Sequence, residues 1–211
     1  MTNMTIPMPV SVLAFLGTIG GTGLLLLVAV WALVRRQDRA WKLAMIGAAS
    51  LVAAYATALL GVAAVSRDRV LAAGEEKYFC EIDCHLAYHV AEAGPDGEGR
   101  WEVTLVTRFD PATTSPARPA DAPLHPGPRL AILRLEDGRE VAGAVTGGTP
   151  LGQALVPGES YQTTVAFQVP AGQPAALLLD DASPEGRFLI GHERSPFHGK
   201  VLLPLVPARR G

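Results

Sequence analysis

The sequence predicts a membrane-anchored all-β protein, in which an N-terminal transmembrane α-helical hairpin is followed by an extracytoplasmic β-domain. Three observations predict this class. Two long apolar stretches lie near the N-terminus, short apolar runs separated by turn signals fill most of the remaining chain, and no useful helical period follows Val70. The predicted divisions are residues 1–66 for the helices, 67–76 for a connector and 77–211 for the β-domain.

The two apolar stretches cover residues 10–34 and 43–65 and contain no ionisable side chain. A transmembrane helix needs about 20 predominantly apolar residues, so both stretches qualify. A cleavable signal peptide would have a shorter apolar region preceded by Lys or Arg, and no such residue precedes residue 10. We therefore expect both helices to remain in the mature protein.

The loop between the helices, residues 35–42, sets the expected orientation. It holds Arg35, Arg36, Arg39 and Lys42, whereas the residues before the first stretch hold no Lys or Arg. Positive charge marks the cytoplasmic side of a membrane. We expect the protein in the inner (cytoplasmic) membrane, with both termini and the β-domain on the periplasmic side.

Glycines in the helices indicate close helix contacts. Gly17 and Gly21 have the GxxxG spacing, and Gly47 lies on the second helix. Small residues let helix backbones approach each other in lipid, where apolar burial offers little drive. The glycines can pack the hairpin on itself or dock it on another membrane subunit, and both interpretations can hold together. The absence of intramembrane charge argues against a transporter.

The β-domain is predicted from runs rich in Val, Leu, Phe and Tyr, separated by turn signals such as Asp137-Gly138 and Pro157-Gly158. Six or seven such strands fit an antiparallel sandwich of immunoglobulin type, with a small β-barrel or a cupredoxin-like domain as the alternative. Residues 111–128 are rich in proline and predict a long surface loop.

One segment, "LVPGESYQTTVAFQVPAGQPAALLLDD", resembles the last strands of a family of immunoglobulin-like bacterial surface domains of unknown function. In that family a Pro-Gly-x-Ser turn precedes a strand that ends in Phe-x-Val-Pro, and a Leu-rich strand follows. The matching residues here are Pro157, Gly158, Ser160, Phe167, Val169 and Pro170. The resemblance implies a fold and an outward location for these C-terminal strands, and it transfers no catalytic residue. The two-helix hairpin departs from the family, whose usual member has a single anchor.

The overall plan also resembles cytochrome oxidase subunit II, which has a helix hairpin followed by an outer copper-binding β-domain. In that family the copper-binding loop reads Cys-x3-Cys-x3-His-x2-Met near the end of the domain. Here the two cysteines open the domain, and no Met follows residue 45. The departure removes most of the support for a dinuclear copper centre.

The run "KYFCEIDCHLAYHV", residues 77–90, contains both cysteines of the chain. As a strand over 78–90, its side chains alternate between two faces. One face would bury Cys80, Ile82, Cys84, Leu86, Tyr88 and Val90; the other would expose Glu81, Asp83, His85 and His89. We interpret the run as a half-buried strand. Its polar face is a solvated surface or a partner contact, with Glu81 and Asp83 as the candidate contact residues.

Three alternatives compete with this strand. A disulfide between Cys80 and Cys84 requires a turn or bulge, because four strand residues span about 13 Å and the α-carbons of a disulfide lie within about 7 Å. A metal site would use Cys80, Cys84, His85 and His89, with copper as the favoured ion or zinc as a second choice. Covalent haem fits less well, because the cysteines are one residue too far apart.

Composition excludes several function classes. From Glu75 onward the chain has 12 Lys and Arg against 18 Asp and Glu, so the outer part is acidic and we expect no nucleic-acid partner. Ser195 lies near His192 and His198, but no nucleophile elbow surrounds it, and we interpret this segment as a connecting loop. No phosphate-binding or dinucleotide motif is present.

We therefore expect a non-catalytic accessory subunit without a cofactor. It would contact the lipid bilayer and other membrane protein subunits of a larger complex, with respiratory and photosynthetic complexes as candidate settings. The alternative is an extracytoplasmic copper-binding or thiol redox module at Cys80 and Cys84. A third, weaker hypothesis is an envelope sensor that binds a ligand in the outer domain.

Overall fold

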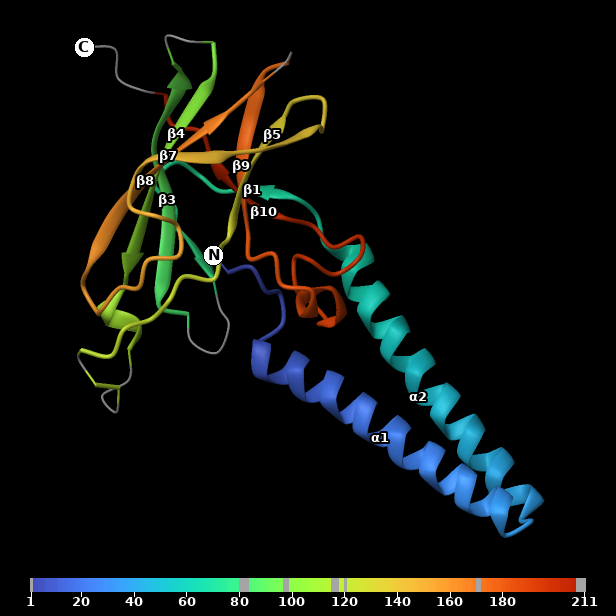
Figure 1. Ribbon diagram of the computed structural model, residues 1–211. Coiled ribbons are helices and arrows are strands. Elements are labelled where there is room, and N and C mark those ends of the chain that lie inside the picture. The colour runs from blue at the N-terminus through green and yellow to red at the C-terminus, as the bar shows by residue number, and fades with distance from the viewer. Residues whose placement is uncertain are drawn as a thin grey trace. The chain divides into compact units, whose positions relative to one another are not determined.

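Two long apolar helices are followed by a β-rich domain with two sheets, as the computed structural model shows (Figure 1). The structure describes residues 2–79, 84–96, 99–114, 118–119, 121–169 and 172–207. Within these residues the chain forms two compact units. One contains residues 4–67 and 184–199, and the other contains residues 1–3, 68–183 and 200–211. The segment 184–199 thus groups with the helices, whereas the sequence placed all of 77–211 in the β-domain.

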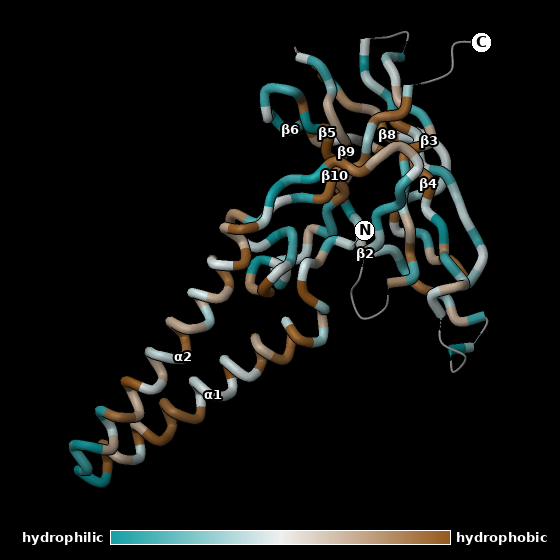
Figure 2. The backbone as a smooth tube through the Cα atoms, turned by 180° about the vertical axis from the view of Figure 1, so that it is seen from behind, coloured by the Kyte–Doolittle hydropathy of each residue, from teal (hydrophilic) through white to brown (hydrophobic). Residues whose placement is uncertain are grey.

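The helices are α1 (Met8–Val34) and α2 (Asp38–Val65), and both are long and apolar enough to cross a membrane. Figure 2 shows the apolar character of both helices and the hydrophilic turn that joins them. The second helix begins earlier than the predicted residue 43, because the charged residues of the turn continue the helix rather than break it. Only the first three predicted loop positions, Arg35 to Gln37, lie between the helices.

The turn between the helices is a Schellman motif. Arg36 has a left-handed backbone with φ of 55°. The Arg36 N–H donates to the Leu33 carbonyl at 3.0 Å, and the Gln37 N–H donates to the Ala32 carbonyl at 2.8 Å. These two bonds satisfy the last carbonyl groups of α1 and reverse the chain within three residues.

Small side chains line the contact between α1 and α2. A Cβ added to Gly21 would lie 2.9 Å from Leu51 Cδ2, and one added to Gly47 would lie 3.5 Å from Leu25 Cδ1. A Cβ added to Gly17 would meet no described atom within 4 Å. Gly21 and Gly47 therefore pack the hairpin on itself, and Gly17 does not.

Ten strands are found in the described residues. They are β1 (Arg69–Val70), β2 (Lys77–Phe79), β3 (Leu86–Pro95), β4 (Trp101–Phe109), β5 (Leu130–Leu135), β6 (Glu140–Ala142), β7 (Ala144–Gly148), β8 (Ser160–Phe167), β9 (Pro174–Asp180) and β10 (Val201–Pro204). Short 3₁₀ helices, η1 (Pro111–Thr113) and η2 (Glu185–Phe188), lie in the connections. The count exceeds the predicted six or seven, because two predicted runs divide at turns, the connector contributes β1, and β7 lies outside the predicted runs.

The strands form two five-stranded sheets with orders β1-β10-β9-β5-β6 and β2-β3-β4-β8-β7. The pairs are antiparallel except for β1 and β10, which are parallel. Both sheets have open ends, so the described strands do not close into the alternative barrel. Thr2 forms an isolated bridge with Tyr78, and the Asn3 N–H donates to the Tyr78 carbonyl at 3.2 Å. The N-terminal residues thereby cover the edge at β2.

The inner faces of the two sheets share one hydrophobic core. Strand β4 alternates strictly, with Val103, Leu105 and Phe109 buried in this core. Leu177 of β9 and Leu203 of β10 meet them from the other sheet. Alternation with period two therefore gives each sheet one apolar face, and the two apolar faces are buried against each other.

A lysine also crosses this core. Lys77 of β2 is fully buried, and its Nζ donates to the carbonyl of Val201 at 2.8 Å and to that of Leu179 at 3.3 Å. The ammonium group also lies 4.7 Å from the centroid of the Phe79 ring. Lys77 therefore connects the edge of one sheet to the backbone of the other.

The glycine contacts predict that the same substitution has different effects on stability at two positions about one helical turn apart. Gly21→Leu should destabilise the helix hairpin by about 1–3 kcal/mol, because the new side chain overlaps the space of Leu51. Gly17→Leu, the matched control, should leave the stability unchanged, because its Cβ meets open space. Thermal unfolding of the purified chain in a mild detergent measures both. Equal midpoints for the two variants would contradict this packing.

Candidate functional site

The cysteine-containing run is not one strand. β2 ends at Phe79 and β3 begins at Leu86, and the two pair as antiparallel neighbours, with Phe79 opposite Leu86. The predicted continuous strand over 78–90 is therefore wrong. Apolar residues alternate in the sequence on both sides of the chain reversal, so their two-residue period did not indicate a turn.

The reversal changes the predicted faces. Cys84 is exposed and His85 is buried at 6% exposure, the opposite of the alternation that the strand required. Cys84 is disulfide-bonded. Cys80, Glu81 and Asp83 lie outside the described residues. A local disulfide requires such a turn, because an extended strand would hold the α-carbons of the two cysteines too far apart.

His85 holds the hairpin loop against the start of the proline-rich segment. Its Nδ1 lies 2.7 Å from Thr113 Oγ1, and its carbonyl accepts from the Asp110 N–H at 2.8 Å. Its ring stacks on Phe109, with centroids 5.6 Å apart and planes 12° apart. Each of these contacts is structural, so His85 is a packed residue of the loop and not part of a polar surface strip.

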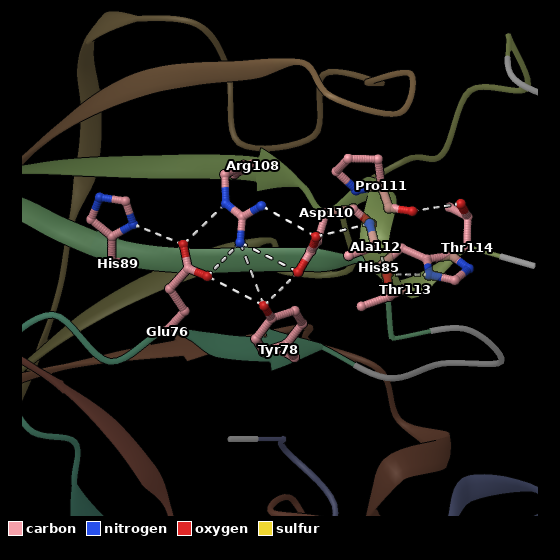
Figure 3. A network of polar contacts seen from close by, with 10 residues as sticks. All are labelled: Glu76, Tyr78, His85, His89, Arg108, Asp110, Pro111, Ala112, Thr113 and Thr114. Carbon is pink, nitrogen blue, oxygen red and sulfur yellow. Dashed lines mark hydrogen bonds and ion pairs between the residues drawn. The ribbon is translucent and has the colours of Figure 1, made fainter.

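A polar network lies beside this loop on the outer face of the sheet (Figure 3). Tyr78, Ala87 and Arg108 are consecutive partners across β2, β3 and β4. Because Ala87 is small, the two larger side chains close over it, and it is fully buried. The Arg108 Nη2 lies 3.5 Å from the Tyr78 hydroxyl oxygen.

Two carboxylates complete this Glu76–Arg108–Asp110 network. Arg108 donates to Glu76 through Nη2 at 2.6 Å and Nε at 3.2 Å. Nη2 also lies 3.4 Å from Asp110 Oδ2, and the Tyr78 hydroxyl donates to the same oxygen at 2.9 Å. His89 Nδ1 lies 3.5 Å from Glu76 Oε1, which forms an ion pair when the imidazole is protonated. Figure 3 shows Glu76, Tyr78 and Asp110 gathered around the Arg108 guanidinium, with His89 beside Glu76.

The network fixes the ionisation of its members. Hydrogen bonding to Arg108 holds the pKa of Glu76 below its usual value, and the Tyr78 hydrogen bond does the same for the pKa of Asp110. Burial and then the Asp110 hydrogen bond raise the pKa of Tyr78 to about 12. The carboxylates thus stay charged and the phenol neutral around neutral pH. This arrangement favours clamping of the strands over acid–base chemistry.

The residues named for a metal site are only partly brought together. His85 contacts Thr113 and His89 contacts Glu76, while the Cys84 sulfur belongs to a disulfide. Among the described residues, no group of three or more His, Cys, Asp or Glu side chains is placed to hold a metal ion. A Cys84 thiolate, the form that binds copper or zinc, would first require reduction of the disulfide.

The loop with Ser195 and two histidines is connecting structure, as the sequence predicted. The Ser195 hydroxyl donates to the Leu189 carbonyl at 2.5 Å, and His192 Nδ1 accepts from the Arg194 N–H at 3.1 Å. His198 Nε2 lies 3.2 Å from Thr5 Oγ1. The serine hydroxyl is directed to a backbone carbonyl, an arrangement that does not activate it as a nucleophile.

Sequence reasoning missed the Glu76–Arg108–Asp110 network. The sequence placed Glu76 in the connector, and Arg108 and Asp110 at the end of a predicted strand. Because Glu76 lies more than 30 residues away from the other two along the chain, no local pattern indicates their contact. The available signal was the pair Arg108 and Asp110 at i and i+2 at the end of a predicted strand.

Comparison with known proteins adds little. No family model matches the chain, and no curated protein matches it. A secreted protein from Mycobacterium tuberculosis, MPT63, is a similar solved structure, with 11% identity and a TM-score of 0.44 over 65% of this chain and 97% of that one. A likeness of this size carries no argument about function.

The network predicts a dependence of stability on acid. Folding lowers the pKa of Glu76 and Asp110, so their contribution is present above the ordinary carboxyl pKa and is lost as pH falls through the folded values. Arg108→Met should lower stability at neutral pH by about 1 kcal/mol, because the partly exposed pairs are screened by solvent. Denaturant unfolding between pH 7 and pH 2 should show the two proteins converging at the acid end.

Arg100→Met is the matched control for this substitution. Arg100 has nearly the same side-chain exposure as Arg108, 33% against 34%, and pairs with Asp96 at 2.7 Å. Its stability should change with acid through the Asp96 carboxylate alone, so the difference between the two variants reports Glu76 and Asp110. If Arg108→Met lost stability in acid as the native protein does, the network would not be what lowers the pKa of Glu76 and Asp110.

The disulfide at Cys84 predicts how the chain responds to copper. Copper added to the oxidised full-length chain should not remain at one ion per chain after dialysis, because the sulfur is not a thiolate. Metal analysis measures this, with and without prior reduction. One retained copper per chain, absent from the Cys84→Ser variant, would establish the copper-binding alternative.

Proposed function

We propose that this protein is a non-catalytic accessory subunit of a larger membrane complex, respiratory and photosynthetic complexes being candidate settings. Its two helices would anchor it beside other membrane subunits. Its β-domain would be an immunoglobulin-like sandwich on the periplasmic side, where it would dock or stabilise partners by surface contacts.

An open glycine face on α1 carries this proposal. A Cβ added to Gly17, Gly20 or Gly23 would meet no described atom within 4 Å. All three residues are exposed, and they lie on a helix that has no ionisable side chain along its length. A surface of small residues on a transmembrane helix lets another helix approach closely. The hairpin uses Gly21 and Gly47 for its own packing and leaves this open glycine face unpaired.

The expected topology supports an extracytoplasmic β-domain. Residues 2 and 3 pair with β2 and β1 follows α2 directly, so both ends of the hairpin connect to the β unit. The four cations at 35–42 lie at the other end of the hairpin. Positive charge favours the cytoplasm for that end.

The polar network supports a binding role over catalysis. Two carboxylates share the Arg108 guanidinium, and burial and hydrogen bonding keep each ionisation state fixed near neutral pH. A rigid, hydrogen-bonded surface next to the exposed Cys84 suits recognition of a protein partner, because little conformational freedom is lost on binding.

Purification from the native membrane tests the proposal. The tagged chain, extracted in a mild detergent, should carry other membrane proteins at fixed stoichiometry. Gly20→Leu combined with Gly23→Leu should reduce their recovery at least about tenfold, because two leucine side chains prevent the close backbone approach that small residues permit.

Two controls make the result specific. Gly61→Leu places the same side chain on an equally open position of α2 and should keep the partners. The double variant should also unfold at the native midpoint when purified alone, which excludes damage to the hairpin. A native chain that is isolated as a lone monomer at every detergent strength would overturn the proposal.

A further inference from the structure

The segment 184–199 contains four consecutive backbone carbonyls that each accept a hydrogen bond from a side-chain hydroxyl. Tyr55 donates to Phe188 at 2.5 Å, Ser195 to Leu189 at 2.5 Å, and Ser11 to Ile190 at 2.6 Å. Thr5 donates to Gly191 through its hydroxyl at 3.2 Å and its N–H at 2.8 Å. Three of the four hydroxyls belong to the helices or to the residues that lead into them.

Such complete pairing is what a dry environment requires. On a protein surface, water satisfies loop carbonyls without dedicated partners. Beside lipid, an unsatisfied carbonyl costs several kcal/mol, so irregular backbone at membrane depth occurs only where the protein supplies its hydrogen bonds. The Tyr55 hydroxyl supplies this bond at Phe188, the innermost of the four carbonyls. The other three hydroxyls bond the carbonyls that lead from it towards the start of α1, along the stretch that runs between α1 and α2 (Figure 1).

The depth of this contact follows from helix geometry. The Phe15 ring of α1 lies 6.1 Å from the Phe188 ring at an interplanar angle of 12°, and 6.2 Å from the Tyr55 ring of α2. With a rise of about 1.5 Å per residue, Phe15 lies about 28 Å from Val34 and Tyr55 about 18 Å from Leu43. The hydrocarbon core of a bilayer is about 30 Å thick. Phe188 therefore contacts the helices within the thickness of the core.

The segment contacts the chain next to both helices at glycines, Gly191 and Gly199, where a larger residue would not fit. A Cβ on Gly191, whose φ is 78°, would lie 2.7 Å from Thr5 Oγ1. A Cβ on Gly199 would lie 2.2 Å from the Arg67 backbone, and its N–H donates to Ser66 Oγ at 2.7 Å. The segment is thus attached to the chain just before α1 and just after α2, and it reaches the hairpin between these points.

Aromatic rings of the segment remain exposed. Phe188 is 54% exposed, although its ring stacks on Phe15. Phe197 is 88% exposed and has a left-handed backbone with φ of 65°, a conformation that strains a bulky residue. An exposed phenylalanine held on an apolar hairpin suits a lipid environment, because acyl chains cover apolar rings that water would not.

From these observations we propose that residues 184–199 form a re-entrant element, which inserts the Phe188 ring into the outer leaflet between the ends of α1 and α2 and leaves the exposed side chains of Glu185 and Arg187 at the headgroups. The ligand of this surface is the lipid bilayer itself. The proposal requires that the two helices span a membrane, and it does not require that the chain has protein partners.

Tryptophan depth measurements on the purified full-length chain test this insertion. Trp31, Trp41 and Trp101 are replaced by Phe, and single-tryptophan reporters are then made as Phe188→Trp and Leu130→Trp. The proteins are reconstituted in phosphatidylcholine vesicles with brominated acyl chains. Phe188→Trp should show blue-shifted emission and several-fold stronger quenching than Leu130→Trp, an exposed apolar position of β5.

Phe197→Trp is a second reporter in case the first fails to fold. Emission of either folded reporter that matches Leu130→Trp, in colour and in quenching, would overturn the proposal. If a protein partner rather than lipid covers these rings in the native membrane, the reporters should match Leu130→Trp in vesicles that contain lipid alone. Because no partner is present, the outcome is independent of the co-purification test.

Hydrogen–deuterium exchange tests the hydroxyl contacts separately. Tyr55→Phe removes the donor to the Phe188 carbonyl and should raise amide exchange in residues 185–191 by roughly tenfold, the effect of one lost hydrogen bond. Thr57→Val is the matched control, because the Thr57 hydroxyl donates to Ala53 of its own helix. Equal exchange in the two variants would show that the hydroxyl does not hold the segment.

Discussion

Backbone polar groups next to apolar surfaces must be bonded within the protein, and this constraint shapes both units of the structure. In the helix unit, the hydroxyl groups of Thr5, Ser11 and Tyr55 bond the carbonyls of a segment that lies far from them in sequence. In the β unit, the ammonium group of Lys77 does the same for Leu179 and Val201. In both cases a side chain crosses from one element to the backbone of another, and that contact fixes which elements lie together.

The outer face of the β2-β3-β4 sheet follows a different rule, because water reaches it. Here a small residue decides the arrangement. Ala87 leaves space above β3, so Tyr78 and Arg108 meet over it, and Glu76 and Asp110 bond the guanidinium from either side. A larger residue at 87 would separate these groups. The network therefore depends on the small side chain of Ala87 as much as on the four charged and polar side chains around it.

Composition and period predicted the coarse architecture well. The two apolar stretches are helices, and the rest is β-structure in two sheets, because hydropathy over a long window and alternation within a strand are local properties of the sequence. The helix bounds differ at α2, since hydropathy ends at Leu43 whereas the helical hydrogen bonds continue back to Asp38. The segment 184–199 was predicted as a loop, and its association with the helices depends on hydroxyls that no local pattern connects.

The cysteine run shows where such reasoning fails. Alternation identifies a strand but not its direction, so a hairpin whose loop residues continue the alternation is indistinguishable from one long strand. The local clue was chemical. Two cysteines in an oxidising compartment favour a disulfide, and a disulfide at this spacing excludes an extended chain. The disulfide chemistry of Cys84 was therefore better evidence about the backbone than the apolar pattern around it.

The two membrane surfaces assigned to α1 are compatible because of helix geometry. Ser11, which bonds the re-entrant segment, and Gly20, at the centre of the open glycine face, are nine residues apart, and at about 100° per residue this places them on opposite sides of the helix. A partner helix on the open glycine face would therefore not compete with residues 184–199 for α1. Gly21, which faces α2, lies about 80° from Ser11 and about 100° from Gly20 around the helix, so neither the loop nor α2 covers the side at Gly20.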